Sequence, residues 1–204
     1  MVKKANSTYI NPGILEVYCG PMKCGKSREL INRVDKLQYI SGSDVIFFKP
    51  KTDTRDKTVK SRFGNLSYNC IFIESNKPEN IISHILNTEE NIDVIVIDEI
   101  QFFQEEIINV IKTLLKNDIN VIAAGLDLDF KGEPFGSMPH ILTLADTVTK
   151  LHAICEHENC NAHATRTQRL IKGKPAHYNS PLILIGDTEH YESRCLLHHF
   201  VPRD

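Results

Sequence analysis

The sequence lacks any excess of positive charge. Its 24 lysines and arginines stand against 26 aspartates and glutamates, which gives a formal net charge of −2. Because proteins that bind nucleic acid usually carry a basic surface, this balance argues against a nucleic-acid partner. No apolar run reaches the length of a membrane-spanning helix, and Lys3 and Lys4 are followed by polar residues rather than by the apolar stretch of a signal peptide. We therefore expect a cytoplasmic protein with no membrane partner.

The chain also lacks internal repeats and low-complexity tracts. Its 204 residues suit one medium domain, or one domain with a small appendage. The six cysteines of such a chain are more typical of free thiols or metal ligands than of a disulfide framework.

Apolar segments of two kinds alternate through the first two thirds of the chain. Short continuous runs predict buried strands, and runs with a spacing of three and four residues predict helices. This alternation is typical of a parallel, doubly wound α/β sheet. The predicted strands are 14–19, 45–48, 71–73, 94–97 and 121–124, and the predicted helices follow residue 26, follow Pro78 and span 107–115.

The pattern changes after Ala145, where helix signals weaken and cysteine and histidine become frequent. We expect a nucleotide-binding α/β domain over residues 1–146 and a smaller, loop-rich and β-rich domain over 147–204.

A phosphate-binding loop is predicted between the first strand and the first helix, because the segment follows the pattern G-x-x-x-x-G-K-[ST]. Such a loop points backbone N–H groups and the positive end of a helix dipole at a phosphate. Lys26 is placed to reach the β- and γ-phosphates, and the Ser27 hydroxyl to ligate Mg²⁺. A chance match in a strand-to-helix turn is the alternative. The loop consists of Gly20, Pro21, Met22, Lys23, Cys24, Gly25, Lys26 and Ser27.

Asp98 and Glu99 follow the predicted strand 94–97. Acidic residues at the carboxyl end of a buried strand lie beside the phosphate loop in this architecture. Asp98 would hold Mg²⁺, and Glu99 could take a proton from the attacking oxygen. The alternative is a pair of solvated charges that cap a helix starting near Gln104. The two residues do not by themselves distinguish a motor, which would activate water, from a kinase, which would activate an acceptor hydroxyl.

From about Ile14 to the C-terminus the sequence resembles the zinc-containing, cytosolic-type thymidine kinases. The phosphate loop alone is generic, but several blocks in a fixed order are specific to that family. These blocks are Gly20-Pro21-Met22, Asp53-Thr54-Arg55, Asp98-Glu99-Ile100-Gln101-Phe102-Phe103, Gly125-Leu126-Asp127-Leu128-Asp129-Phe130, Gly132-Glu133-Pro134-Phe135, Thr167-Gln168-Arg169 and Tyr191-Glu192.

The resemblance implies a P-loop (RecA-like) fold with a small zinc-containing lasso domain. It also implies transfer of the γ-phosphate of ATP to the 5′-hydroxyl of thymidine, feedback inhibition by dTTP and a homotetramer. Glu99 would be the catalytic base. The positions implied for ATP and Mg²⁺ are the phosphate loop, Asp53, Arg55, Asp98 and Gln101. The positions implied for thymidine are Met22, Phe102, Leu126, Phe130, Thr167, Leu182, Ile183, Leu184, Ile185, Gly186 and Tyr191. From position alone, Phe102 and Phe130 could equally be core aromatics.

Cys155, Cys160, Cys195 and His198 form two close pairs that bracket the implied lasso. Cys-x-x-His is an ordinary zinc half-site, whereas Cys155 and Cys160 are separated by four residues where the family usually has two. We expect a structural zinc held by these four residues. His157 or His199 could replace a ligand, and reduced cysteines without a metal are the alternative.

Two residues of the phosphate loop depart from the family pattern. Lys23 and Cys24 stand where the family commonly has Phe and Ser or Ala, and a thiol at a helix N-terminus is expected to ionise more easily. A nucleic-acid-stimulated ATPase and a zinc-ribbon module with a vestigial nucleotide site remain competing interpretations.

Overall fold

The computed structural model describes residues 13–41, 44–51, 58–60, 67–88, 92–183 and 189–203. Among the residues implied by the resemblance, Asp53, Arg55, Leu184, Ile185 and Gly186 lie outside these ranges. Within the described ranges, no helix is both long enough and apolar enough to cross a membrane.

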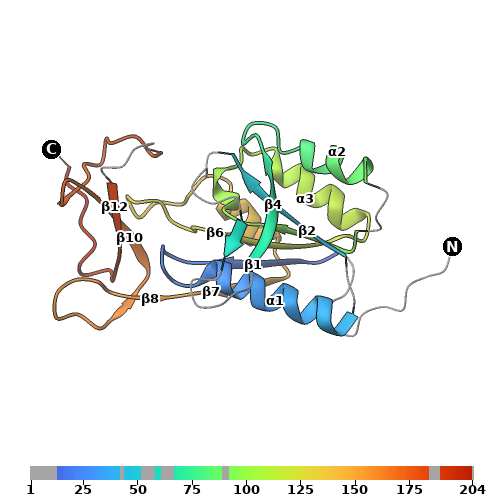
Figure 1. Cartoon of the computed structure of the whole chain (residues 1–204). Coiled ribbons are helices and arrows are strands. Elements are labelled where there is room, and N and C mark those ends of the chain that lie inside the picture. The colour runs from blue at the N-terminus through green and yellow to red at the C-terminus, as the bar shows by residue number, and fades with distance from the viewer. Residues whose placement is uncertain are drawn as a thin grey trace.

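A seven-stranded sheet forms the centre of the molecule, in the order β3-β4-β2-β5-β6-β1-β7 (Figure 1). Six strands run parallel, and the edge strand β3 pairs with β4 in the antiparallel direction. The strands are β1 (Leu15–Cys19), β2 (Val45–Pro50), β3 (Thr58–Lys60), β4 (Ser67–Ile73), β5 (Val94–Ile97), β6 (Asn120–Gly125) and β7 (Thr147–Lys150).

Helices cover both faces of this sheet, because every central strand is apolar on both sides. Leu30, Val34 and Leu37 of α1 form one core with the strands, and Figure 1 shows α1 on the opposite side of the sheet from α2 and α3. The other core includes Ile81 of α2, Ile107 of α3 and apolar residues of α4. The sheet is therefore doubly wound, as predicted. The helices are α1 (Lys26–Ser41), α2 (Asn80–Leu86), α3 (Ile107–Lys116) and α4 (Met138–Leu144), with a short 3-10 helix η1 (Ile100–Phe102).

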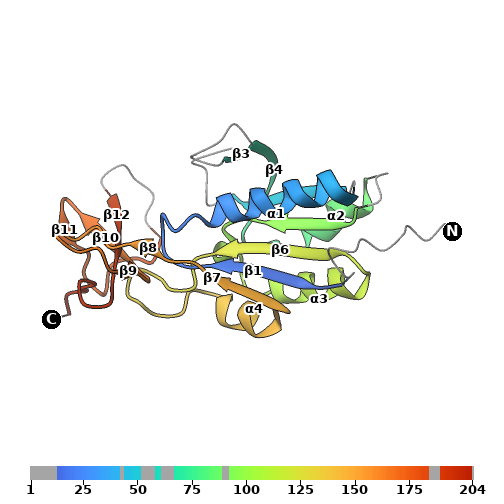
Figure 2. The ribbon, with the colours of Figure 1, turned by 90° about the horizontal axis from the view of Figure 1, so that it is seen from below.

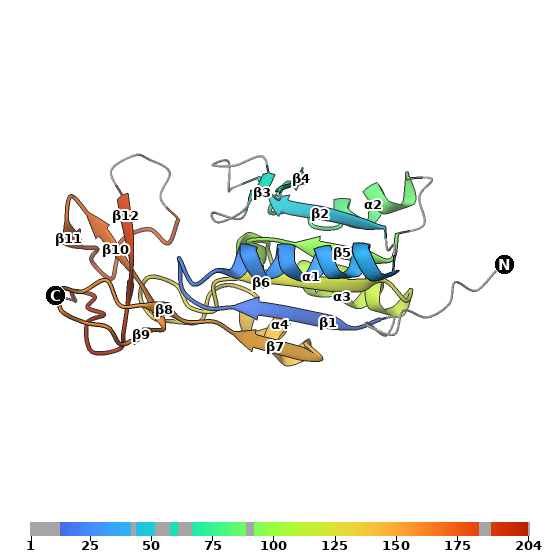
Figure 3. The same cartoon turned by 60° about the horizontal axis from the view of Figure 1, so that its bottom comes forward.

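Two small sheets lie beyond the carboxyl ends of β1 and β6, as Figures 2 and 3 show. One has the order β11-β10-β12, and the other pairs β8 with β9. Their position places them over the phosphate loop. Their strands are β8 (Ala153–Ile154), β9 (His163–Ala164), β10 (Arg166–Ile171), β11 (Lys174–Pro175) and β12 (Glu189–Arg194).

Strand β7 begins the segment that we assigned to the second domain, yet it pairs in parallel with β1 and completes the large sheet. Its sequence did not predict a strand, because its side chains at this edge are mostly exposed and form no apolar run. Helix α4 was not predicted either. It is seven residues long and has a proline in its first turn, so its periodic signal is weak.

Candidate active site

The phosphate loop joins β1 to α1 and owes its shape to residues with positive φ. Gly20, Lys23 and Gly25 have φ values of 139°, 63° and 93°. The side chain of Lys26 is buried within the loop, and its Nζ donates hydrogen bonds to the carbonyl oxygens of Gly20 (3.1 Å) and Pro21 (2.8 Å). The predicted loop thus leads into a helix that begins at Lys26.

Gly20 is required for a second reason, which is the close approach of the chain after β7. A Cβ atom at this position would lie 2.4 Å from the carbonyl oxygen of Leu151 and 3.0 Å from the sulfur of Cys24. The Leu151 amide in turn donates to the carbonyl oxygen of Cys19 at 2.8 Å. The first residue of the loop is therefore fixed against the chain that leaves the large sheet.

The expectation that Cys24 ionises easily was wrong. Burial raises the pKa of its thiol above the ordinary value, and this effect outweighs the charge and hydrogen bonds of Lys26, which lower it. Cys24 packs instead against the small apolar cluster that contains Cys155 and Cys195.

Asp98 lies at the end of β5 with only 1% of its surface exposed. Lys49, which is also buried, is the second-last residue of β2, and its Nζ lies 3.3 Å from Oδ2 of Asp98. Burial and the charge of Glu99 raise the pKa of Asp98 to about 6, although Lys49 and Lys26 lower it. The strands that precede the phosphate loop and Asp98, β1 and β5, are both parallel neighbours of β6, so the loop and the acidic strand end lie at the same edge of the sheet. A divalent cation bound there would favour the ionised carboxylate.

Glu99 adopts a left-handed backbone conformation, with φ 54° and ψ 38°. Such a conformation is strained for a residue other than glycine, and it often marks a functional position. Gln101 fixes the carboxylate, because its Nε2 donates to Oε2 of Glu99 at 2.7 Å. The other amide atom of Gln101 accepts from the backbone N–H of Leu126 at 3.0 Å.

The alternative role of this pair as helix caps is not supported. Glu99 precedes η1 but its side chain makes no capping hydrogen bond, and α3 begins at Ile107 after Glu106. Neither carboxylate is therefore needed to complete a helix. Gln101 instead connects Glu99 to Leu126, the residue that follows β6. Strand β6 lies between β5 and β1, the strand that precedes the phosphate loop.

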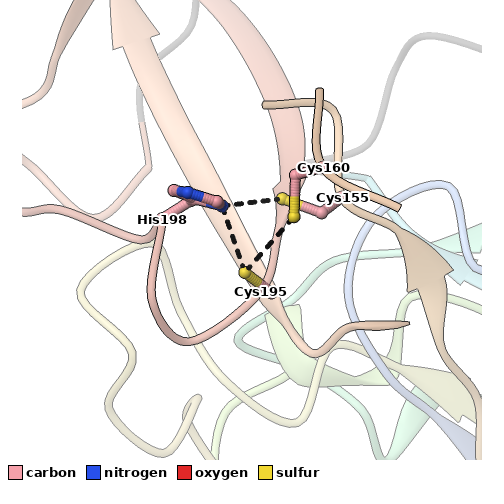
Figure 4. Close-up of side chains that lie close together, drawn as sticks. All are labelled: Cys155, Cys160, Cys195 and His198. Atoms are coloured by element: carbon pink, nitrogen blue, oxygen red, sulfur yellow. Dashed lines mark hydrogen bonds between the residues drawn. The ribbon is translucent and has the colours of Figure 1, made fainter. Parts of the chain in front are cut away.

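Three cysteines and one histidine, from the turn after β8 and the turn after β12, gather as Figure 4 shows. Nδ1 of His198 lies 3.3 Å from Sγ of Cys195 and 3.7 Å from Sγ of Cys155, and the sulfurs of Cys160 and Cys195 are 4.0 Å apart. Ligand atoms around a tetrahedral zinc ion are separated by about 3.6–3.8 Å. The four predicted residues therefore fit zinc in both chemistry and spacing.

The local structure also favours metal binding by thiolate. Burial raises the pKa of Cys155, but hydrogen bonds from the backbone amides of Cys195 and His157, and from the ring of His198, lower it to about 6. The four-residue spacing is accommodated by a turn in which Asn159 takes a positive φ of 59° and the Cys160 amide donates to the carbonyl oxygen of His157.

The two other histidines that we considered as ligands have different contacts. The ring of His157 stacks on that of His198 with 3.9 Å between centroids. The Nε2–H of His199 donates to the carbonyl oxygen of Phe130 at 2.9 Å. The group of ligand atoms within 4.8 Å of one another contains Cys155, Cys160, Cys195 and His198.

Comparison with known proteins agrees with this arrangement. The sequence model of a family described as thymidine kinase matches residues 13–199. The chain belongs to the thymidine kinase family. A thymidine kinase from Coprothermobacter proteolyticus is 49% identical over 191 residues, which are 93% of this chain and 92% of that protein. A thymidine kinase from Mycoplasmoides gallisepticum (strain R(low / passage 15 / clone 2)) is 45% identical over 204 residues, which are 99% of this chain and 87% of that protein.

In this member of the thymidine kinase family, the small sheets hold the phosphate loop. The backbone amide of Met22 donates to the Thr167 hydroxyl on β10 at 3.0 Å. The Ser193 hydroxyl on β12 donates to the carbonyl oxygen of Met22 at 2.7 Å. Both side chains are almost fully buried, so the loop is bound from two neighbouring strands at once.

Glu156 adds a third connection, which sequence reasoning missed. Its Oε1 accepts from Nζ of Lys23, and its Oε2 accepts from the backbone amide of Ser193, each at 2.6 Å. Burial acts to raise the pKa of Glu156, but these hydrogen bonds outweigh it and lower the pKa below its ordinary value. Two of the departures from the family pattern, Lys23 in the loop and the longer segment between Cys155 and Cys160, therefore meet in one contact.

The aromatic residues implied for the thymidine pocket differ in burial. Phe102 is half-buried and meets Phe135 edge to face, with 5.5 Å between ring centroids. Phe130 is almost completely buried, and the guanidinium of Arg169 lies 4.1 Å above its ring. Tyr191 accepts a hydrogen bond from Arg169, whereas Leu182 and Ile183 are exposed.

Four residues that take part in these contacts were not expected from the sequence to do so: Lys49, Glu156, Arg169 and Ser193. Each acts through a partner distant in the chain, so no local spacing marks it. For Arg169 alone there was a signal, because it belongs to the block Thr167-Gln168-Arg169 that carries the family resemblance. The structure shows that these three polar and charged residues are buried in β10.

Proposed function

We propose that this chain, as a member of the thymidine kinase family, transfers the γ-phosphate of ATP to the 5′-hydroxyl of thymidine with Glu99 as the general base. The observation that supports this most directly is the meeting of two charged elements. The phosphate loop with Lys26 follows β1 and Asp98 follows β5, and because both strands are parallel neighbours of β6 the two elements lie at the same edge of the sheet. Glu99 follows Asp98 in a strained, hydrogen-bonded conformation.

The proposed reaction needs one proton transfer and one displacement. Glu99 accepts the proton of the thymidine 5′-hydroxyl as the oxygen attacks the γ-phosphorus of ATP, the bond to the β-γ bridging oxygen breaks, and ADP leaves. The loop amides and Lys26 stabilise the phosphate charge. Ser27 and Asp98 would hold Mg²⁺, which supplies further charge stabilisation, and Asp53 and Arg55 are proposed to act near the phosphates and the acceptor.

For the nucleoside we propose contacts from both parts of the chain. Phe102 and Phe130 would form walls around the base, with Met22, Leu126 and Thr167 beside it, and Tyr191 would hold the deoxyribose. Residues 182–186 would line the base pocket. Closure of the segment from about 146 to 181 would exclude water, because a kinase with an open site would hydrolyse ATP.

The activity can be tested with labelled ATP, Mg²⁺ and a panel of nucleosides, each with and without DNA. Label transferred to thymidine is the expected result. DNA-dependent release of free phosphate, with no labelled nucleoside, would instead support a motor ATPase and overturn the proposal. Including deoxyuridine in the panel measures how strictly the thymine methyl group is required.

Further proposals concern assembly and regulation. From the resemblance we propose a homotetramer that dTTP inhibits, which size-exclusion chromatography with light scattering and a dTTP titration would test. We also propose a nucleotide-binding domain and a zinc-containing lasso domain, with the boundary expected near residue 146 moved to the end of β7, because that strand completes the large sheet. Because none of the six cysteines, all of which lie in the described residues, forms a disulfide, we propose the reducing cytoplasm as the compartment.

A further inference from the structure

A buried arginine lies among the residues proposed to bind thymidine. Arg169 on β10 has 2% of its surface exposed. Its Nε donates to the hydroxyl of Tyr191 at 3.0 Å, and its two terminal nitrogens donate to the carbonyl oxygens of Pro181 and Leu182. The face of the guanidinium covers the ring of Phe130, with 4.1 Å from Cζ to the ring centroid. One side chain thus contacts four residues from three separate segments.

The chemistry of these contacts is specific to arginine. A guanidinium is planar and directs five N–H donors in fixed directions, while its faces stack on aromatic rings. Nε can therefore donate a hydrogen bond to Tyr191 while the two terminal nitrogens donate to two successive backbone carbonyls. At the same time the face of the guanidinium stacks on the ring of Phe130. A lysine ammonium at the same position has one nitrogen and no planar face, so it cannot make all of these contacts.

We propose that Arg169 is a positioning residue that sets the affinity of this kinase for its nucleoside. It would do so by fixing Phe130, Tyr191 and the chain at Leu182 relative to one another, and the proposal rests on the proposed function because these three are proposed thymidine contacts. The phosphate loop is held by the neighbouring Thr167 instead. ATP affinity should therefore depend on Thr167 and not on Arg169.

The test is the variant Arg169→Lys, which keeps the positive charge but loses the several N–H donors in fixed directions and the planar face that stacks on Phe130. We expect the KM for thymidine to rise by about ten- to hundredfold, the loss expected when several charge-assisted hydrogen bonds are removed. The KM for ATP should change by no more than about threefold, because the loop contacts remain. A purely structural role would move both constants together.

Arg166→Lys is the matched control. Arg166 lies on the same strand, and its NH1 donates to the backbone and side-chain oxygens of its neighbour Thr165. Since the two arginines are three residues apart, they lie on opposite faces of β10. We expect the KM for thymidine in this control to stay within about twofold of wild type.

A double-mutant cycle with Tyr191→Phe separates positioning from direct contact. If Arg169 acts partly through the Tyr191 hydroxyl, the combined loss in thymidine affinity should be clearly smaller than the product of the two single losses. Independent, multiplicative losses would contradict this part of the proposal.

The wild-type protein decides between failure of the inference and failure of the proposed function. If wild type does not phosphorylate thymidine, the proposed function is wrong. If wild type does so and Arg169→Lys leaves the KM for thymidine unchanged, or raises both KM values equally, the inference alone is wrong. If Arg169→Lys does not fold, the variant Arg169→Gln is measured in its place, with the same expected rise in the KM for thymidine. If both variants melt far below wild type, Arg169 serves folding and the inference is overturned.

Discussion

Lys23 and Glu156 lie 133 positions apart and form an ion pair with 2.6 Å between Nζ and Oε1. The same carboxylate accepts a hydrogen bond from the backbone amide of Ser193, and the hydroxyl of Ser193 donates one to the carbonyl oxygen of Met22. These bonds link the phosphate loop to the segment that begins at Cys155, one of the four residues proposed to hold zinc. Nucleotide binding should therefore depend on how firmly the small sheets hold the loop.

The first prediction tests this link with Glu156→Gln, which removes the charge and keeps the size. Because both partners are partly exposed, with 29% and 38% of their side-chain surfaces accessible, the pair should contribute no more than about 1 kcal/mol. We expect the KM for ATP to rise about two- to fivefold at low ionic strength, and the difference from wild type to shrink in high salt.

Glu158→Gln is the control, because Glu158 is an exposed carboxylate in the same segment. An equal rise in the KM for ATP in this control would mean that net charge near the loop, rather than the contact with Lys23, is responsible.

The second prediction concerns Glu99. Replacement by Gln removes the base while preserving most of the shape, so kcat should fall by about two to four powers of ten. Binding of ATP, measured by calorimetry, should remain close to wild type because the loop and Asp98 are unchanged. Glu105→Gln, an exposed position on the following turn, should have little effect. A kcat for Glu99→Gln within a few-fold of wild type would remove Glu99 from the mechanism.

The buried central strands and the phosphate loop could be predicted because their signals are local. A continuous run such as Val94–Ile97 is buried on both faces of the sheet, and the loop motif stands between a strand and a helix. The cluster of three cysteines and one histidine was also predicted from its spacing, and the structure places His198 in it and not the neighbouring His199.

The remaining features depend on contacts between distant residues, which leave no pattern in a single sequence. Strand β7 is a strand because β1 offers it a partner, not because Thr147–Lys150 is apolar. Arg169 is buried because Tyr191 and two carbonyls satisfy its donors. Cys24 was misjudged for the same reason, since its burial by the small sheets outweighs the helix N-terminus.

The third prediction is that purified wild type contains about one zinc per chain, and that Cys155→Ser loses it. Because the metal holds together segments with only a small apolar cluster of their own, its loss should lower the melting temperature by about 5–10 °C. Metal content by atomic emission and melting by calorimetry measure the two effects. Cys70→Ser, on β4 in the large sheet, is the control and should retain the zinc. Zinc-free wild type with the same melting temperature after chelation would contradict the assignment.

The fourth prediction compares three glycines that share a positive φ but differ in surroundings. Gly20 has φ 139° and a Cβ there would lie 2.4 Å from the Leu151 carbonyl oxygen, whereas Cβ atoms at Gly25 and Gly173 would meet nothing within 4 Å. Gly173→Ala should therefore cost only the conformational strain of about 1–2 kcal/mol, seen as a small drop in melting temperature. Gly25→Ala should add a loss of ATP affinity, because the loop amides point at the phosphates. Gly20→Ala should cause the largest loss of both melting temperature and ATP affinity, because the added Cβ must also displace the chain after β7. If Gly20→Ala and Gly173→Ala melt at the same temperature, the close approach at Leu151 does not constrain the loop.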